Sequence, residues 1–127
     1  CLARPDKTVI SVSGDGGFHF SSQELETAVR MKCNFVHIIW TDGGYNMVEF
    51  QEVMKYGHSA GVEFGPIDTV KFAEAHGAVG FRITDPDQIG PTLRKALEIP
   101  GPVLVDIPVD YRDNIKLGEA MHKGVIV

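Results

Sequence analysis

The sequence predicts a doubly wound α/β fold, in which helices cover both faces of a parallel sheet. Runs of apolar, mostly β-branched residues are typical of buried parallel strands. Stretches with helical spacing or helix-capping residues separate these runs, so strands and helices alternate along the chain. The 127 residues suffice for a single domain, residues 1–127, with its own core. The predicted strands are residues 9–12, 35–40, 79–83 and 103–109.

The first helix is expected to begin at Ser22, after a glycine-rich turn. Ser21 and Glu24 have the spacing of a capping box, in which the two side chains satisfy backbone amides at the start of a helix. Leu25 and Val29 follow at helical spacing, so one apolar stripe is expected to face the sheet.

A second helix is predicted over residues 46–56. Met47, Val48 and Phe50 spread over an arc that is too wide for one sheet-facing stripe. Some of these side chains are therefore expected to face a second partner or a ligand, although a helix buried on two sides would give the same pattern. The residues that follow, 58–66, have no periodicity and are predicted to form a loop.

Capping residues mark two further helices. Asp68 precedes a short predicted helix over residues 69–76, which Gly77 ends. Asp85, followed by a proline, precedes the last helix. Pro91 falls inside that helix, where it is expected to remove a hydrogen bond and to kink or delay the helix.

Composition excludes several classes of function. The formal net charge of −5 argues against nonspecific binding to nucleic acid or to anionic membranes. The sequence contains no run of about 18 apolar residues, so no transmembrane helix is predicted. The two cysteines, Cys1 and Cys33, suggest no disulfide framework, which favours a cytoplasmic protein. The first residues include no initiator Met and no apolar segment of a signal peptide, which suggests a piece of a longer chain.

Two acidic loops follow the first two predicted strands. Asp15 lies in the glycine-rich segment 14–17, and Asp42 follows the strand at residues 35–40. Ligands of open α/β sheets bind outside the carboxyl ends of the strands. Two carboxylates among glycines suit a magnesium ion that also holds phosphates. Gly-Asp-Gly alone is also common in ordinary turns, so the prediction of a magnesium and phosphate site depends on both loops together.

Two histidines lie near these loops. His19 follows the glycine-rich segment and either lines the site or, more often for a single histidine in a turn, is solvated or packed. His37 lies inside the second predicted strand, where a satisfied core histidine is more common than a catalyst. We therefore assign neither of them a catalytic role.

Together the two loops resemble the fingerprint of the thiamine diphosphate-dependent enzymes, in which Gly-Asp-Gly precedes a second loop opened by an acidic or amide residue. More narrowly, the chain is similar to the catabolic acetolactate synthases. The biosynthetic branch typically carries Gln-Trp-Gln after the second loop, whereas residues 49–52 read Glu-Phe-Gln-Glu. The stretches that carry the narrower resemblance are Ser13–Phe18, Glu24–Arg30, Tyr45–Val48, Val62–Gly65 and Ile107–Tyr111.

The resemblance implies the thiamine diphosphate-binding fold and a site for thiamine diphosphate and Mg²⁺. Asp15 and Asp42 would give side-chain oxygens to the magnesium ion, and Gly44 a backbone carbonyl. The residues implied to bind the cofactor are Gly14, Asp15, Gly16, Gly17, Tyr45, Asn46 and Met47. The residues implied to lie near the reacting carbon are Met47, Val48 and Gln51.

The resemblance also implies an activity, in which one pyruvate is decarboxylated and condensed with a second pyruvate to 2-acetolactate. It implies that other domains of a longer, homo-oligomeric enzyme (a dimer or tetramer) supply the carboxylate that activates the cofactor, so the isolated chain is expected to be inactive. Two alternatives stay open. One is another thiamine diphosphate-dependent 2-oxo acid decarboxylase or oxidase, and the other is a non-catalytic cofactor-binding module.

Overall fold

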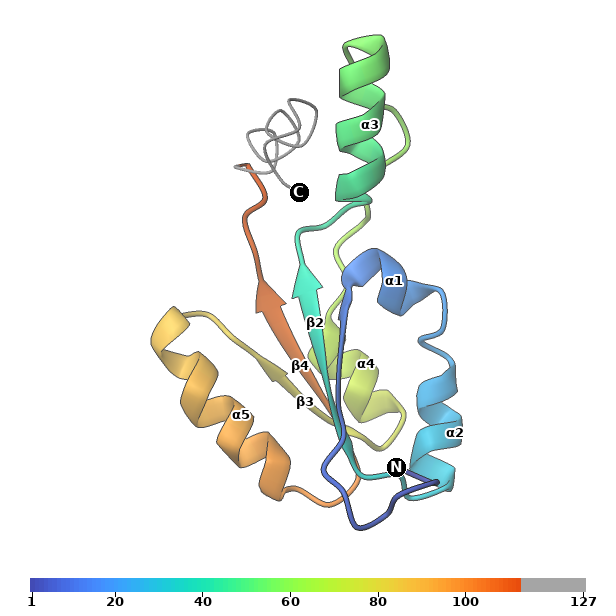
Figure 1. The fold of residues 1–127 in the computed structure, drawn as a ribbon, viewed down its shortest axis with the longest axis vertical. Helices are drawn as coiled ribbons and strands as arrows, with labels where there is room; N and C mark the ends of the chain where they lie inside the picture. Colours follow the sequence, from blue (N-terminus) through green and yellow to red (C-terminus); the bar gives the residue numbers. More distant parts are fainter. Residues whose placement is uncertain (113–127) are drawn as a thin grey trace, which may run out of the picture.

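The computed structural model describes residues 1–112, and a parallel four-stranded sheet lies at the centre of this part of the chain (Figure 1). The strands lie in the order β1-β2-β4-β3, which confirms the predicted α/β fold with a parallel sheet. The prediction of one domain over residues 1–127 extends past the described residues and stays a prediction. The strands are β1 Ile10–Gly14, β2 Phe35–Thr41, β3 Val79–Arg82 and β4 Pro102–Pro108.

Helices cover both faces of the sheet, as predicted. One face packs against α1, α2 and α4, and the other packs against α5 (Figure 1). The helices are α1 Asp15–His19, α2 Glu24–Arg30, α3 Asn46–Tyr56, α4 Thr69–Ala75 and α5 Ile89–Glu98, with the short 3₁₀ turn η1 Pro86–Gln88 before α5.

The central strand β4 supplies side chains to both layers of the core. Val103 and Val105 share a core cluster with Ala96 of α5, whereas Leu104 shares one with Ala73 of α4. None of the three strand residues is more than 1% exposed. A strand that is buried on both faces needs apolar side chains at successive positions, which explains its continuous apolar sequence.

The predicted caps of the two later helices are confirmed. The Asp68 carboxylate accepts a hydrogen bond from the backbone N–H of Lys71 at 3.0 Å. Gly77 follows α4 with a φ of 79°, a left-handed conformation that favours glycine. The Asp85 carboxylate accepts a hydrogen bond from the backbone N–H of Asp87 at 2.8 Å, at the start of η1.

The segment after β1 is a short helix rather than the predicted turn. The helix α1 begins at Asp15 and contains Gly16 and Gly17, which are poor helix formers. Phe18, on the same helix, is only 7% exposed and belongs to the core cluster beneath α2 and α4. Burial of this ring stabilises a helix that local propensity alone does not predict.

Two further expectations are wrong. The helix α2 begins at Glu24, not at Ser22, and the Glu24 N–H donates to the backbone carbonyl of Ser21 at 3.0 Å. No side-chain capping bond is present at its N-cap, so there is no capping box. By contrast, the expected delay of the last helix agrees with the structure, because the chain forms the 3₁₀ turn η1 after Asp85 and the α-helix begins only at Ile89, two residues before Pro91.

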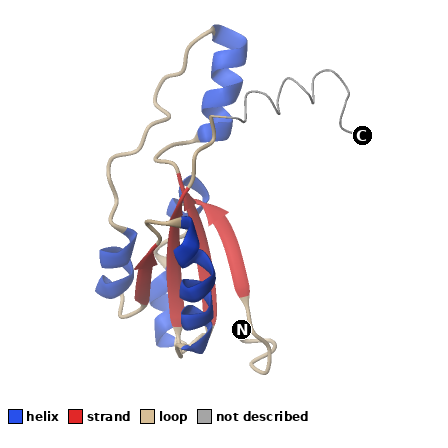
Figure 2. Ribbon diagram, turned by 90° about the vertical axis from the view of Figure 1, so that its left-hand side faces the viewer, coloured by secondary structure: helices blue, strands red, loops and turns tan. Residues whose placement is uncertain are grey.

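The helix α3 projects from the body of the molecule, beyond the carboxyl ends of the strands (Figure 2). Its bounds agree with the predicted 46–56, and Gly57 follows it with a φ of 78°. None of its residues is buried. Its exposed apolar side chains are Met47, Val48, Val53, Met54 and Tyr56. Nothing in the described fold therefore covers the apolar surface of α3.

Across residues 1–112, no helix combines the length and the apolar character needed to cross a membrane.

Candidate functional site

The two predicted aspartates meet at the carboxyl ends of β1 and β2. The Asp15 side chain is only 5% exposed, and its Oδ1 accepts a hydrogen bond from the backbone N–H of Gly16 at 2.8 Å. Its Oδ2 accepts from the backbone N–H groups of Gly43 at 2.8 Å and of Asp42 at 3.2 Å. Asp15 therefore joins the loop after β2 to the start of α1.

Negative charge is concentrated where the two loops meet. Partial desolvation raises the pKa of the Asp42 carboxyl, and the nearby charge of Asp15 raises it further. A cation between the two carboxylates would relieve this repulsion. Among residues 1–112, no three His, Cys, Asp or Glu side chains lie close enough together to hold a metal ion. A metal at this position therefore needs backbone or phosphate oxygens beside the two carboxylates.

Two of the predicted glycines are required by close packing. A Cβ at Gly16 would lie 2.9 Å from the ring of Tyr45, and a Cβ at Gly44 would lie 2.9 Å from the carbonyl oxygen of Val62. By contrast, a Cβ at Gly14 would meet only the Trp40 carbonyl oxygen, at 3.9 Å. Internal packing therefore explains Gly16 and Gly44, whereas it would tolerate a Cβ at Gly14.

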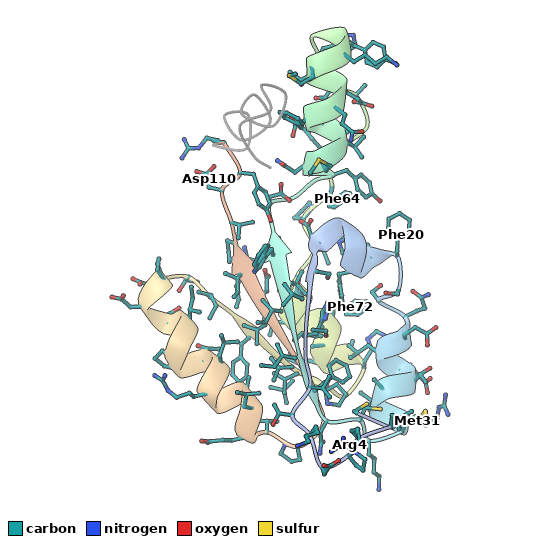
Figure 3. All side chains as sticks on the ribbon, in the orientation of Figure 1. Arg4, Phe20, Met31, Phe64, Phe72 and Asp110 are labelled. Atoms are coloured by element: carbon teal, nitrogen blue, oxygen red, sulfur yellow. The ribbon has the colours of Figure 1, made fainter. Side chains whose placement is uncertain are left out.

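The segment that follows α3 returns to hold the second loop. The N–H of Tyr45 donates to the carbonyl of Val62 at 2.8 Å, and the N–H of Phe64 donates to the carbonyl of Gly43 at 2.7 Å. The rings of Tyr45 and Phe64 meet edge to face with centroids 4.4 Å apart. Phe64 lies between the base of α3 and α1 (Figure 3). The loop after β2 is thus fixed by Asp15 on one side and by residues 62–64 on the other.

Both histidines near the site have packing roles. The ring of His19 lies edge-on to Phe64, with centroids 5.5 Å apart. The ring nitrogens of His37 are hydrogen-bonded to the hydroxyls of Ser11 at 2.7 Å and Ser13 at 3.0 Å. These contacts agree with the packed interpretation of His19 and with the satisfied core histidine expected at His37.

A cleft of about 520 Å³ lies between α3 and the segment after β4. Asp110 lies beyond the end of β4, on the opposite side of the cleft from α3 (Figure 3). Tyr111 also lines the cleft; burial raises the pKa of its phenol, as do the charges of Asp42 and Asp15. The lining residues are Asp42, Gly43, Gly44, Asn46, Glu49, Phe50, Val53, Met54, Val62, Glu63, Val109, Asp110, Tyr111 and Arg112.

The structure brings only some of the predicted site residues to this cleft. Asp42, Gly44 and Asn46 line it, and Asp15 lies directly behind Asp42. The three residues expected near the reacting carbon, Met47, Val48 and Gln51, are exposed on α3 and are not among the lining residues of the described chain. Their role stays a prediction.

Sequence reasoning assigned no role to Tyr111, although it follows the end of β4. To predict a role for Tyr111, one must know that β4 lies beside β2 in the sheet, and the sequence alone did not show this. Because β4 pairs with β2, the residues after both strands emerge side by side at the same edge. Tyr111 therefore reaches the loop that carries Asp42.

Comparison with known proteins identifies the family. The domain described as "Thiamine pyrophosphate enzyme, C-terminal TPP binding domain" matches residues 1–107. The chain belongs to the thiamine pyrophosphate enzymes. Within this family, the chain is 54% identical over 116 residues to the acetolactate synthase of Bacillus subtilis (strain 168), covering 91% of this chain and 20% of the relative. It is also 54% identical over 126 residues to the catabolic acetolactate synthase of Raoultella terrigena, covering 99% of this chain and 22% of the relative.

A solved structure of the same family has a similar fold. It is the thiamine diphosphate-dependent 4-hydroxybenzoylformate decarboxylase of Rhodococcus jostii RHA1, with a TM-score of 0.78 and 28% identity. The match covers 86% of this chain and 21% of that protein. The chain thus spans about a fifth of the length of the thiamine pyrophosphate enzymes that it matches.

Proposed function

We propose that this chain forms the diphosphate- and magnesium-binding part of an acetolactate synthase. The reaction joins two pyruvate molecules to 2-acetolactate with loss of carbon dioxide. The observation that carries the proposal is the contact between the Asp15 and Asp42 loops at the carboxyl edge of the sheet. The 54% identity to two relatives named acetolactate synthase supports this choice of reaction.

The residues at this edge suit Mg²⁺ and a diphosphate. Magnesium prefers hard oxygen ligands and keeps some positions for substrate phosphates. Asp15 and Asp42 offer such oxygens, and their mutual repulsion favours a cation. Internal packing does not require a glycine at Gly14, and a residue without a side chain there would let a diphosphate approach the backbone closely.

In the proposed reaction, this chain binds and orients the magnesium ion and the cofactor. In this proposal Asp15, Asp42 and the carbonyl of Gly44 hold the magnesium ion, and Tyr45 and Asn46 lie against the cofactor. When bound, thiamine diphosphate supplies the electron sink that lets a 2-oxo acid lose carbon dioxide. The cleft between α3 and residues 109–112 would receive pyruvate and limit its access to water.

We also propose that α3 is covered in the complete enzyme. Met47, Val48 and Gln51 are exposed here, so they can line a reaction site only if other domains of the protein or a second subunit pack against α3. A homo-oligomer would provide such a partner. The cytoplasm is the proposed compartment, and it suits the free thiols of Cys1 and Cys33.

A second candidate is a thiamine diphosphate-dependent decarboxylase that releases an aldehyde instead of joining two substrates. The named activity of the Rhodococcus structure favours it. The identity of the product formed from pyruvate separates the two candidates, because 2-acetolactate retains five carbons and acetaldehyde only two.

Calorimetric binding of thiamine diphosphate to the full-length protein, with Mg²⁺ and with a chelator, tests the site. We expect binding that requires magnesium. Asp15 accepts three hydrogen bonds from backbone N–H groups and so also holds the two loops together. Replacing Asp15 would remove these bonds as well as a metal ligand, so Asp42→Ala is the cleaner variant. We expect Asp42→Ala to weaken binding at least as much as loss of an outer-shell partner does, about 10- to 100-fold.

The matched control is Glu98→Gln, which alters an exposed acidic residue on α5. It should bind as the wild type does. Binding that is independent of magnesium, or an Asp42→Ala variant that binds like Glu98→Gln, would contradict the proposed site.

A further inference from the structure

One carboxylate in the core has no role in the proposed reaction. Asp106 lies on β4, is 0% exposed, and stands where an apolar residue would be expected beside Leu104 and Ile107. A buried charge is costly unless it is paired and hydrogen-bonded. Both oxygens of Asp106 are engaged: Oδ2 accepts from the guanidinium of Arg82 at 2.5 Å, and Oδ1 accepts from the hydroxyl of Thr41 at 2.6 Å.

These two contacts join three neighbouring strands at one level of the sheet. Arg82 is the last residue of β3, and Thr41 is the last residue of β2. Asp106 lies between them on β4 and also accepts a backbone hydrogen bond from Ile83 at 2.8 Å. The half-exposed Arg82 anchors the buried carboxylate, and the carboxylate in turn fixes the Thr41 side chain.

Thr41 directly precedes the predicted metal ligand Asp42. The peptide group between these two residues is bonded at both ends. Its carbonyl accepts from the N–H of Val109 at 3.0 Å, and its N–H donates to Oδ2 of Asp15 at 3.2 Å. The bond between the Thr41 hydroxyl and Asp106 adds a third tether, because it ties the side chain of the residue that begins this loop to the core of the sheet.

We propose that Asp106 is a positioning residue for the metal loop, and that it acts through the hydroxyl of Thr41 on the backbone and side chain of Asp42. This inference rests on the proposed function, because it assigns a role at the same site. Hydrogen-bonded partners behind a metal ligand typically contribute 10- to 100-fold to metal affinity, because they hold the ligand in its binding orientation. Asp106 itself does not line the cleft and is not one of the proposed metal ligands.

The most direct test changes Thr41, since Asp106→Asn leaves a buried polar group beside Arg82 and risks misfolding. Thr41→Val keeps the volume of the side chain and removes its hydroxyl. Thr41→Ser restores the hydroxyl. The matched control is Asn34→Ala, which removes a hydrogen bond between the same two strands at their opposite end, where Asn34 accepts from the N–H of Gly101 at 2.6 Å.

The first measurement is made on the metal-free full-length protein, by amide hydrogen exchange of the segment that contains Asp42 and Gly43. We expect exchange to be faster in Thr41→Val than in the wild type, and unchanged in Thr41→Ser and Asn34→Ala. Equal exchange in Thr41→Val and the wild type would overturn the proposal, whatever the metal does.

The second measurement is the Mg²⁺ concentration that half-saturates thiamine diphosphate binding. We expect Thr41→Val to raise it about 10-fold or more, with Thr41→Ser and Asn34→Ala within about twofold of the wild type. A Thr41→Val value equal to that of Asn34→Ala would also overturn the proposal. A wild type that needs no magnesium would instead contradict the proposed function, and hydrogen exchange would still decide whether Thr41 positions the loop.

Discussion

His37 shows how a single buried side chain satisfies its polar atoms and still affects stability. Its ring is half-buried on β2, where Ser11 and Ser13 bind both nitrogens and Phe18 lies 5.7 Å away in a stacked arrangement. A hydroxyl can donate or accept, so either neutral tautomer of the ring is satisfied. Among residues 1–112 a protonated ring gains no negative partner there, and desolvation lowers the pKa of His37 below its ordinary value of 6.5.

This pKa shift predicts a dependence of stability on pH. Between the lowered pKa of the folded state and 6.5, the unfolded chain binds a proton at His37 that the folded chain does not. The contribution of His37 to stability is therefore complete above 6.5 and is lost as the pH falls through that window. The slope is at most about 1.4 kcal/mol per pH unit, and less for a half-buried ring.

Urea unfolding at pH values from 5 to 8 measures this slope. We expect His37→Gln to be less stable overall but to lack the part of the slope that His37 contributes. The matched control is His58→Gln, which changes an exposed histidine outside the core. A slope that is the same in all three proteins would exclude the assigned role of His37.

Glycines at the site show what sequence can reveal about single positions. The glycine-rich pattern was enough to predict a ligand-binding edge of the sheet. It could not show which glycines are required by packing inside the protein and which are not. The structure explains Gly16 by the ring of Tyr45 and Gly44 by the backbone of Val62. Both partners come from other loops, so their proximity depends on tertiary contacts that the local sequence does not encode.

The helices were predicted well where their signals are local. The helix at residues 46–56 and the caps at Asp68 and Asp85 agree with the structure, because periodicity and capping depend on neighbouring residues. The helix α1 was missed because the core burial of Phe18 outweighs the low propensity of two glycines. Its formation depends on a core cluster that includes α4, which is distant in the sequence, as well as the neighbouring α2.

The contact between α4 and β3 yields a prediction for one glycine. A Cβ at Gly80 would lie 2.7 Å from the Cα of Val70 and 3.2 Å from the Cβ of Ala73, so the backbone of α4 would have to move. We expect Gly80→Ala to lower the free energy of unfolding by about 1–3 kcal/mol, the usual cost of overpacking.

Gly90, on α5, is the matched comparison. The nearest atoms to an added Cβ there belong to the flexible guanidinium of Arg94, at 3.5 Å. Gly90→Ala should therefore be neutral or stabilise by up to about 1 kcal/mol, because alanine favours the helix. Thermal unfolding of both variants decides the point. A Gly80→Ala protein as stable as Gly90→Ala would show that α4 does not pack as closely as described.

For the chain as a whole, the sequence predicted the topology better than it predicted the surroundings of the site. Parallel strands and their order of appearance follow from composition and periodicity, and so does the edge where Asp15 and Asp42 meet. The placement of Met47, Val48 and Gln51 near the reacting carbon came from resemblance alone, and these residues lie exposed on α3. Nothing among residues 1–112 covers α3, so their role near a reacting carbon stays a prediction.

Two apolar surfaces of the described chain support a last prediction. One is the surface of α3, none of whose residues is buried. The other is the face of β1 and β2 formed by Ile10, Val12 and Trp40, which are 52%, 54% and 45% exposed. Helix α5 packs on the same side of the sheet but covers β2 and β4. Parallel sheets are normally buried on both faces, so these surfaces favour association.

We therefore expect the isolated 127-residue chain to bind a hydrophobic dye and to self-associate with rising concentration, and to form no 2-acetolactate from pyruvate. Exposed apolar surface of this kind binds such dyes and drives association. Without cover over α3, residues such as Met47 and Gln51 cannot enclose a substrate. Sedimentation, dye fluorescence and a product assay, each compared with the full-length protein, provide the measurements. An isolated chain that is monomeric at all concentrations and binds no dye would contradict the exposure of these surfaces. Acetolactate formation by that chain would show that α3 needs no partner for the reaction.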